Sequence, residues 1–305
     1  MASWGGPASR FLTLLACGSA LVATPALADN NRADVEQSGS GNTLLLTQWD
    51  DGDTVLFVGQ GASDRPGQRR ANVITIDQAN GDWVGTALQA NPAVRGNGVN
   101  HNVMRISQRS TGDGIAEATQ FGVGNVLEIT QEGGGGNQVS VAAQAGRGNR
   151  LDLTQDGAGN VAGAVQFGHG NRAAIEIGDA GAPSDGNVVA VAQYGDFNTV
   201  RLSIDGSFNG AGMFMPGSPA AALGLLPGMV VQGGDFNMVR LTVGGRRGGA
   251  GDRNLFAFEQ DGSGNTIAGR QSGNGNEAAI QQVSSGNGAF FFQVGGMNVI
   301  AVRQI

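Results

Sequence analysis

Short segments in which apolar and polar residues alternate recur along most of the chain. Between Asn149 and Gln155 the odd positions hold Asn, Leu, Leu and Gln, and the even positions hold Arg, Asp and Thr. An alternation with a period of two is typical of a β-strand with one buried face. The same split occurs in residues 72–78, 102–108 and 298–304. Each segment therefore predicts a strand whose apolar face carries an amide at both ends.

Glycine-rich connectors join these segments at a period of eleven residues. Gln120 is followed by Phe-Gly-Val-Gly-Asn and then, after five residues, by Gln131; Gln155 is followed by Asp-Gly-Ala-Gly-Asn and, after five residues, by Gln166. Glycine supplies the positive φ that a tight reversal needs. Since a unit this short cannot bury its own apolar face, its copies must stack as a solenoid.

The predicted fold is all-β, a cross-β-like β-solenoid of about ten strand–turn–strand layers with two parallel stacked sheets. Two strands and two connectors make a layer of 22 residues, and ten layers give a rod of about 45 to 50 Å at cross-β spacing. Alternate strands are expected to differ in bulk so that the two sheets interdigitate. One set has large inward residues (Leu44, Leu46, Ile74, Ile76, Leu127, Ile129, Leu151, Leu153), and the other has small ones (Gly85, Ala87, Ala116, Ala118, Ala162, Ala164), with Val55, Phe57, Val189 and Val191 as exceptions.

The inward amides at the strand ends are the candidate functional residues. A buried amide without a partner costs about 1 to 3 kcal/mol, and the equivalent amide one layer away can both donate and accept at a spacing of about 4.7 to 4.8 Å. Three strands carry Ile177, Ile204 or Val243 in place of the glutamine. The predicted assembly ladder comprises Gln37, Asn42, Gln48, Asn72, Gln78, Asn102, Gln108, Gln120, Asn125, Gln131, Gln144, Asn149, Gln155, Asn160, Gln166, Asn187, Gln193, Asn198, Asn254, Gln260, Asn265, Gln271, Asn276, Gln282, Asn287, Gln293, Asn298 and Gln304.

Five irregular stretches interrupt the period, at 61–71, 90–101, 178–186, 210–231 and 244–253. A solenoid tolerates insertions at its turns, and we expect these to be such insertions. The longest, 210–231, is apolar, but its three prolines argue against a membrane-spanning helix. We expect it to fold over the flank of the rod, and the alternative is a docking surface.

Residues 1–28 have the features of a cleaved secretory signal peptide. Arg10 precedes an apolar run, and Ala26 and Ala28 form an Ala-x-Ala cleavage site. In the alternative interpretation Cys17 is a lipoprotein acceptor, but the apolar run before it is shorter than usual. Cleavage after Ala28 removes the one cysteine, and with it any disulfide or thiolate metal site. We expect residues 29–36 to be a short N-terminal segment and residues 37–305 to be the repeat solenoid.

Composition narrows the functional classes. The chain has 54 glycines in 305 residues and 14% charged residues, against about 25% charged in ordinary domains. Its 40% of hydrophobic residues argue against disorder. Loss of Arg10 leaves 18 − 1 = 17 basic against 25 acidic side chains, a net charge of −8, which disfavours nucleic acid as a partner.

The sequence predicts neither an enzyme nor a cofactor or metal site. His101 and His169, the only histidines, lie in connectors with no partnered base or nucleophile at strand spacing. The central outward residues differ in sign, as a solubilising surface that opposes lateral association would (Arg105, Glu128, Asp152, Arg201, Arg240). Calcium-binding solenoids have a nine-residue period with turn aspartates, and an ice-binding threonine row would be interrupted here by Ser107 and Glu176.

The unit Gln-x-Gly-x-Gly-Asn, followed by five residues and Gln, begins at Gln37, Gln120, Gln144, Gln155, Gln260 and Gln271. It resembles the repeats of curlin, the subunit family of bacterial curli fibres. The resemblance implies a chain that leaves unfolded through an outer-membrane pore, folds outside as a β-solenoid, and polymerises end to end into an amyloid fibre for adhesion and biofilm. The implied partners are further copies, related curlin subunits and the outer-membrane secretion machinery, and the implied location is an extracellular, pilus-like fibre or the cell surface.

Three features differ from the family pattern. Asn42, Asn102, Asn125 and Asn149 stand where curlin repeats commonly have Ser, the layers are more numerous, and only residues 29–36 precede Gln37. We expect a fibre subunit or nucleator, whose end strands are left unshielded near Gln304 and grow by β-augmentation. The alternative is a non-polymerising secreted adhesin that binds a surface partner through the 210–231 insertion.

Overall fold

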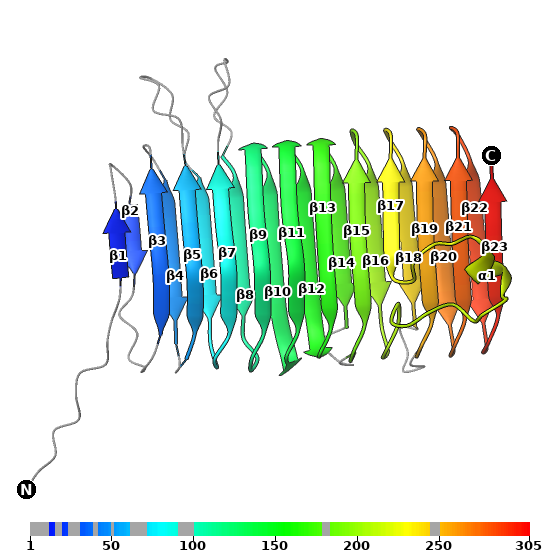
Figure 1. Cartoon of the computed structure of the whole chain (residues 1–305), viewed down its shortest axis with the longest axis horizontal. Helices are drawn as coiled ribbons and strands as arrows, with labels where there is room; N and C mark the ends of the chain where they lie inside the picture. The colour runs from blue at the N-terminus through cyan, green and yellow to red at the C-terminus, as the bar shows by residue number, and fades with distance from the viewer. Residues whose placement is uncertain are drawn as a thin grey trace, which may run out of the picture.

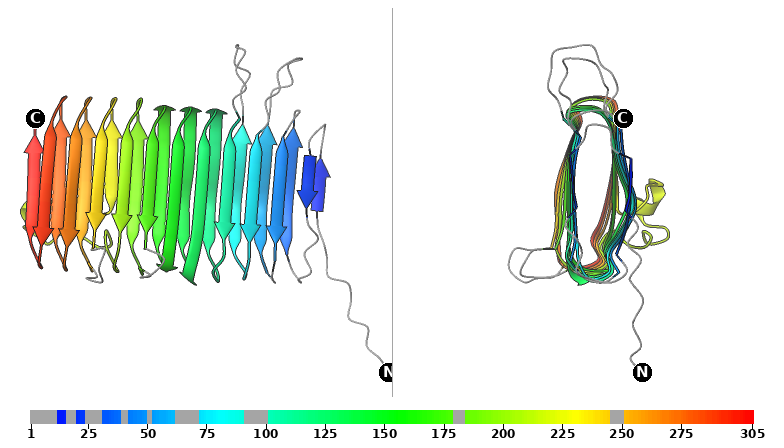
Figure 2. Two further views of the ribbon diagram at one scale, coloured as in Figure 1. Left: turned by 180° about the vertical axis from the view of Figure 1, so that it is seen from behind. Right: turned by 90° about the vertical axis from the view of Figure 1, so that its left-hand side faces the viewer.

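Two parallel sheets face each other along a flattened rod (Figure 1). The computed structural model describes residues 31–38, 42–49, 52–61, 72–90, 101–178, 184–244 and 251–305, together with the strand backbone of 12–15 and 20–23. Seen along the rod, the chain winds in narrow loops with one sheet on each long side (Figure 2). The predicted all-β solenoid is confirmed.

The strands alternate between the two sheets in sequence order. The 12-stranded odd sheet contains β1 (Leu12–Leu15), β3 (Arg32–Ser38), β5 (Thr54–Gly61), β7 (Trp83–Ala90), β9 (Gly114–Val123), β11 (Gln138–Arg147), β13 (Val161–His169), β15 (Val188–Tyr194), β17 (Met229–Gly233), β19 (Leu255–Asp261), β21 (Glu277–Val283) and β23 (Val299–Gln304). The 11-stranded even sheet contains β2 (Ala20–Ala23), β4 (Thr43–Gln48), β6 (Val73–Gln78), β8 (Val103–Gln108), β10 (Val126–Gly135), β12 (Arg150–Ala158), β14 (Arg172–Ile177), β16 (Thr199–Ile204), β18 (Met238–Val243), β20 (Thr266–Ser272) and β22 (Gly288–Val294).

One odd strand, the even strand after it and their connectors form one rung. Arg150 pairs with Arg172, and Leu255 pairs with Glu277, so the basic rung has the predicted 22 residues. Insertions lengthen other rungs, as where Thr199 pairs with Met238, 39 residues away. Pairing is equally clear after residue 209, because β17 lies between β15 and β19, and β18 lies between β16 and β20.

Four of the predicted insertions lie largely outside the described residues, at 61–71, 90–101, 178–186 and 244–253. The strands on either side of each belong to opposite sheets: β5 and β6, β7 and β8, β14 and β15, β18 and β19. Each insertion therefore takes the place of a turn, as predicted.

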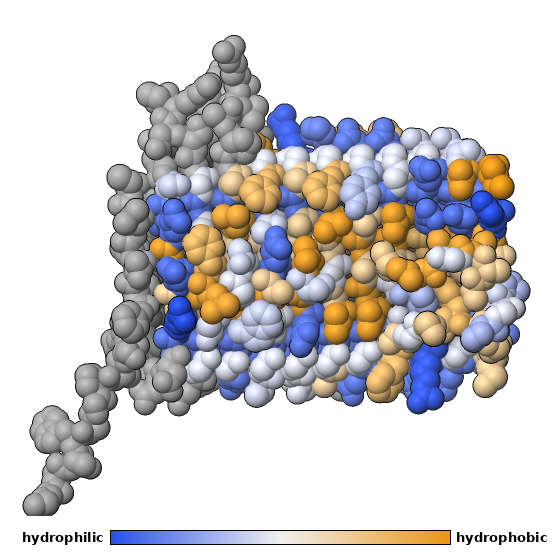
Figure 3. Space-filling view, viewed as in Figure 1, coloured by the Kyte–Doolittle hydropathy of each residue, from blue (hydrophilic) through white to orange (hydrophobic). Residues whose placement is uncertain are grey.

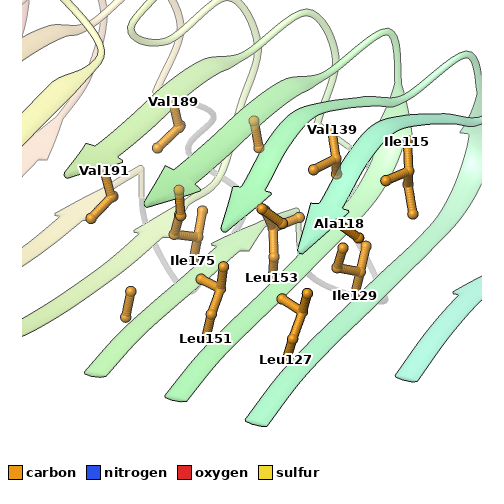
Figure 4. Close-up of a cluster of buried hydrophobic side chains, with 14 of the residues drawn as sticks. Ile115, Ala118, Leu127, Ile129, Val139, Leu151, Leu153, Ile175, Val189 and Val191 are labelled. Atoms are coloured by element: carbon orange, nitrogen blue, oxygen red, sulfur yellow. The ribbon is translucent and has the colours of Figure 1, made fainter. Parts of the chain in front are cut away.

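The core lies between the sheets and is apolar along its middle. Figure 4 shows Leu127, Ile129, Leu151 and Leu153 of the even sheet close to the smaller residues of the odd sheet, such as Ala118. The eight predicted large residues are all buried, and so are Ala87, Ala118, Ala162 and Ala164. The alternation of bulk between the sheets therefore lets them pack closely.

The prediction is wrong for three residues of the odd sheet that were expected to point inward. Phe57, Gly85 and Ala116 are not buried, and Val58, Val84 and Ile115 are buried in those strands instead. The pairing shifts by one residue opposite Val55 to Val58, and again between Val139 and Ala142. Such a β-bulge adds one residue to a strand and moves the residues before it to the other face. A list of inward positions made by counting back from the glutamine in steps of two is therefore wrong beyond a bulge.

The insertion predicted at 210–231 leaves from within an odd strand and not from a turn, which corrects the prediction. The Gly210 amide donates to the Asn254 carbonyl at 2.8 Å, and the Gly228 amide donates to the Phe256 carbonyl at 2.7 Å, so both glycines lie on the strand path. Residues 211–227 form the excursion, which we call the strap, and residues 229–231 belong to β17. Without the strap, Asn209 and Gln232 are six positions apart, as Asn187 and Gln193 are.

The strap folds over the outward face of the odd sheet, as expected for the flank of the rod. In Figure 1 it crosses β19 and β21 and places α1 (Pro219–Ala222) beside the end of the rod. Phe214 and Ala220 pack against Leu255, Ala257 and Ala279 of that face. The surrounding face mixes hydrophobic and hydrophilic side chains (Figure 3).

The first regular strand begins earlier than predicted. β3 starts at Arg32, so residues 32–36 of the expected N-terminal segment belong to the solenoid. The cleavage positions Ala26 and Ala28 lie outside the described residues, and cleavage stays a prediction. Inside the predicted signal peptide, β1 and β2 pair with β3 and β4. No helix in the described ranges is long and apolar enough to cross a membrane.

Candidate assembly ladders

A continuous row of glutamines runs through the odd sheet. In every pair of neighbouring strands from β3 to β23 the side-chain nitrogen donates to the side-chain oxygen of the next glutamine, at 2.5 to 3.3 Å. The row consists of Gln37, Gln60, Gln89, Gln120, Gln144, Gln166, Gln193, Gln232, Gln260, Gln282 and Gln304. Each side chain between the two ends of the row thereby uses its oxygen for one rung and its nitrogen for the next.

The same nitrogens also tie the two sheets together. Gln144 donates to the Val126 carbonyl at 3.0 Å, and Gln166 donates to the Arg150 carbonyl at 3.0 Å, both at the start of an even strand. A primary amide has two N–H groups, so both bonds can form at once. From Gln144 to Gln304 each ladder nitrogen therefore bonds along the rod, across it, or both, and closes the edge of its rung.

The even sheet has a glutamine ladder that is broken in the middle. Gln48, Gln78, Gln108, Gln131 and Gln155 are bonded in series, and Gln271 donates to Gln293 at 2.9 Å. Between them Ile177, Ile204 and Val243 stack on one another and are fully buried. Replacing both partners of a buried hydrogen bond by apolar groups can be nearly neutral. One polar atom remains unsatisfied at the break, the side-chain oxygen of Gln271.

The asparagines bond differently from the expected amide-to-amide ladder. The Asn125 side-chain oxygen accepts from the Asn149 backbone amide at 3.0 Å, and the Asn149 side-chain nitrogen donates to the Gly168 carbonyl at 2.9 Å. In parts of the odd sheet an amide-to-amide bond is added, as from Asn160 to Asn137 at 3.0 Å. Because asparagine is one methylene shorter than glutamine, it reaches the adjacent backbone and clamps the turn.

The predicted ladder residues lie at the two inner edges of the rod. All are buried except Gln48, Asn287 and Gln304, which are half-buried, and Asn298, which is exposed. Residues of the rows that sequence reasoning missed are Asn31, Asp53, Gln60, Asp82, Gln89, Asp113, Asn137, Asn171, Asn209, Gln232 and Asn237. The spacing of six to Ile177 and Val243 identifies Asn171 and Asn237, whereas the bulged strands, with a spacing of seven, hid Asp53, Asp82 and Asp113.

The turns depend on a column of glycines at positive φ. Gly146 has φ +119°, and a Cβ there would lie 2.0 Å from the carbonyl oxygen of Gly168 in the next rung. Gly168 has φ +116° and the same conflict with Gly195. The close stacking of turns therefore excludes any side chain at this position.

The outward faces carry charges of both signs, as predicted. Arg150 bridges Glu128 and Asp152 at 2.8 Å each on the even sheet, and Arg105 also contacts Glu128. His169 lies 3.0 Å from Asp196 on an exposed turn. Among the residues that the structure describes, no group of three or more His, Cys, Asp or Glu side chains is arranged to hold a metal ion.

Comparison with known proteins supports a curlin repeat assignment. Residues 146–176 match the family model described as Curlin associated repeat. The matched segment runs from the end of β11 to β14 and contains Asn149, Gln155, Asn160, Gln166 and Asn171. A comparison with curated proteins found no match.

Proposed function

Because the chain carries the curlin repeat and the same strand unit continues through both sheets, we propose that it is a structural subunit of a curli-like amyloid fibre outside the cell. The observation that supports this most strongly is the unbroken glutamine ladder of the odd sheet, from Gln37 to Gln304.

Growth along the rod axis follows from the equivalence of the rungs. Where no bulge intervenes, as between β13 and β15, a rung offers its neighbour a row of strand N–H and C=O groups and the glutamine of the odd-sheet ladder, all in one register. A rung of a second copy presents the same groups, so it can add as a further parallel strand pair. The assembly ladder therefore acts in both folding and polymerisation.

Sideways association is opposed by the outward faces. Arg201 and Arg240 are exposed neighbours of like charge on the even sheet, and the Arg105–Glu128–Arg150 group lies further along it. Charged outward residues are a common protection against sheet-to-sheet association. In the proposal the fibre lengthens and does not stack laterally.

We further propose how the chain reaches the outside of the cell and what it does there. The chain is exported with cleavage after Ala28, at the site formed by Ala26 and Ala28. Its partners are further copies, related curlin subunits and the outer-membrane secretion machinery, and the fibre contributes to cell adhesion and the biofilm matrix. The proposal includes no catalysis and no cofactor. A seeding experiment separates the two fibre roles: a nucleator starts growth of a curlin at a small molar fraction, and a major subunit instead forms the bulk of the fibre.

The second candidate is a non-polymerising adhesin that binds a surface partner through the strap. This is favoured by the exposed apolar residues of the strap, because Met213 is 83% and Leu226 is 65% exposed. Deleting residues 211–227 and joining Gly210 to Gly228 distinguishes the candidates. The join keeps the strand path because the two glycines are adjacent: a Cβ at Gly210 would lie only 3.0 Å from the Gly228 Cα.

The measurement is thioflavin fluorescence and sedimentation of the chain from residue 29, with and without the strap, together with cell binding. A fibre subunit polymerises in both forms. If neither form polymerises and the deletion abolishes cell binding, the adhesin account replaces the fibre account.

A further inference from the structure

Three consecutive strands of the odd sheet have an aspartate where the neighbouring strands have asparagine. Asp53, Asp82 and Asp113 precede β5, β7 and β9, and they lie between Asn31 and Asn137 in the same row. All three aspartates are fully buried. The row therefore brings three carboxyl groups together inside the rod at the spacing of the rungs, about 4.8 Å.

One oxygen of each carboxyl does what an asparagine oxygen does. The Asp53 carboxylate accepts from the Asp82 amide at 3.1 Å, Asp82 accepts from the Asp113 amide at 2.8 Å, and Asp113 accepts from the Asn137 amide at 2.9 Å. This half of the ladder is thus continuous through the aspartates.

The second atom of the group distinguishes the two residue types. The Asn137 nitrogen donates to the Gly157 carbonyl at 2.9 Å, whereas an ionised carboxylate has no hydrogen to donate. The Asp82 Oδ2 is buried and has no hydrogen-bond partner, while the Asp113 Oδ2 accepts from the Ser110 hydroxyl. A proton on Asp82 makes that carboxyl a donor and acceptor, as an amide is.

Asp82 and Asp113 follow strands of the even sheet that end in uncharged side chains. Gln78 and Gln108 of the even sheet, which end the strands leading into Asp82 and Asp113, are neutral amides. The nearest charged groups on those strands, Asp77 and Arg109, form an exposed pair with each other at 3.5 Å. Burial raises the pKa of Asp82 to about 7; the carboxyls of Asp113 and Asp53 add to this rise, and the backbone amides of Asp113 and Ala79 oppose it.

We propose that Asp82, between Asp53 and Asp113, is a proton-binding site inside the rod, and that closure of the rungs of β5, β7 and β9 depends on the proton held there. With the proton bound, the row continues the amide ladder. Without it, the rungs contain adjacent buried negative charges, which is costly in a dry interior.

The direction of the pH effect follows from proton linkage. A carboxyl whose pKa is higher in the folded rungs than its ordinary 3.8 binds more protons when folded. Its stabilising contribution is therefore complete below about pH 4 and is lost as the pH rises to about 7. Rungs that have asparagine in this row, such as those of β19 and β21, gain no pH-dependent stability from it.

The test is hydrogen exchange of the assembled chain between about pH 5 and about pH 8, expressed as protection factors that correct for the intrinsic exchange rate. We expect protection of β5, β7 and β9 to fall at least tenfold across this range relative to β19 and β21 in the same molecule. Equal changes in both regions would overturn the proposal, whether or not the protein forms fibres.

Two variants sharpen the result. Asp82→Asn supplies the missing donor, so protection of β7 should become independent of pH, while Asp34→Asn, on the exposed face of β3, should behave as the unmodified chain. An infrared band of a protonated carboxyl should be present at neutral pH and absent from the Asp82→Asn variant. A pH dependence that persists in Asp82→Asn would contradict the assignment.

Discussion

The side-chain nitrogen of Gln166 donates to the side-chain oxygen of Gln193, 2.7 Å away and one rung further along the rod. The two residues are 27 positions apart because an insertion lies between them, yet they meet in the same register as pairs 22 positions apart. Register is therefore set by the strands and the amides, and the connectors adapt to it.

Gln166→Leu should destabilise the rod, because Gln193 loses the donor to its buried oxygen and Gln144 loses its acceptor. Each orphaned group costs about 1 to 3 kcal/mol. The measurement is the urea midpoint of the folded or assembled chain. Gln138→Leu, the same change at an exposed position of β11, is the control and should leave the midpoint almost unchanged.

The apolar break predicts strong coupling between substitutions. Ile204→Gln alone places an amide between Ile177 and Val243 without a partner and should cost about 1 to 3 kcal/mol. The triple change of residues 177, 204 and 243 to Gln should join Gln155 to Gln271 and recover much of that loss. Additive effects of the three single substitutions would show that the amides do not bond along this edge.

Two turn glycines should differ in their tolerance of alanine. Gly168→Ala brings a Cβ within 2.0 Å of the Gly195 carbonyl oxygen, whereas Gly159→Ala meets nothing within 4 Å. Both have positive φ, so Gly159→Ala should cost about 1 kcal/mol through backbone strain, and Gly168→Ala should cost several times more or prevent folding. Thermal unfolding of the two variants checks the order.

Phe214→Ala should release the strap without opening the rungs. Phe214 is 5% exposed and packs against the outward residues of β19 and β21, and the nearby Met215 amide donates to Glu277 at 2.6 Å. Limited proteolysis should then cut residues 211–227 faster, while exchange protection of β21 stays high. Met213→Ala, at an 83% exposed neighbour, is the matched control and should not change the rate.

Sequence periodicity predicted the parts of this fold in which a strand is regular. The segment around Leu151 and Leu153 alternates between apolar and polar residues and has one amide at each end, six positions apart. This pattern identifies the strand, its buried face and its ladder positions. Those features depend on the alternation of side chains between the two faces of a strand, and the sequence of a single strand is enough to show it.

What the pattern could not predict depends on neighbouring rungs. The bulge before Gln89 is visible only as a spacing of seven from Asp82, and an aspartate does not suggest an amide ladder until Asn137 is seen in the same row. Similarly, Asn209 and Gln232 take the two end positions of one rung's odd strand path, but the strap separates them by 23 positions. In both places the register of the adjacent strands decides the structure.

X-ray fibre diffraction of the chain from residue 29 tests the central claim most directly, because the proposed polymer repeats the spacing between rungs along its axis. The account predicts that the chain assembles and gives a meridional reflection near 4.7 to 4.8 Å with strands perpendicular to the fibre axis. A chain that stays a soluble monomer for days at about micromolar concentration, or fibres without that reflection, would contradict it.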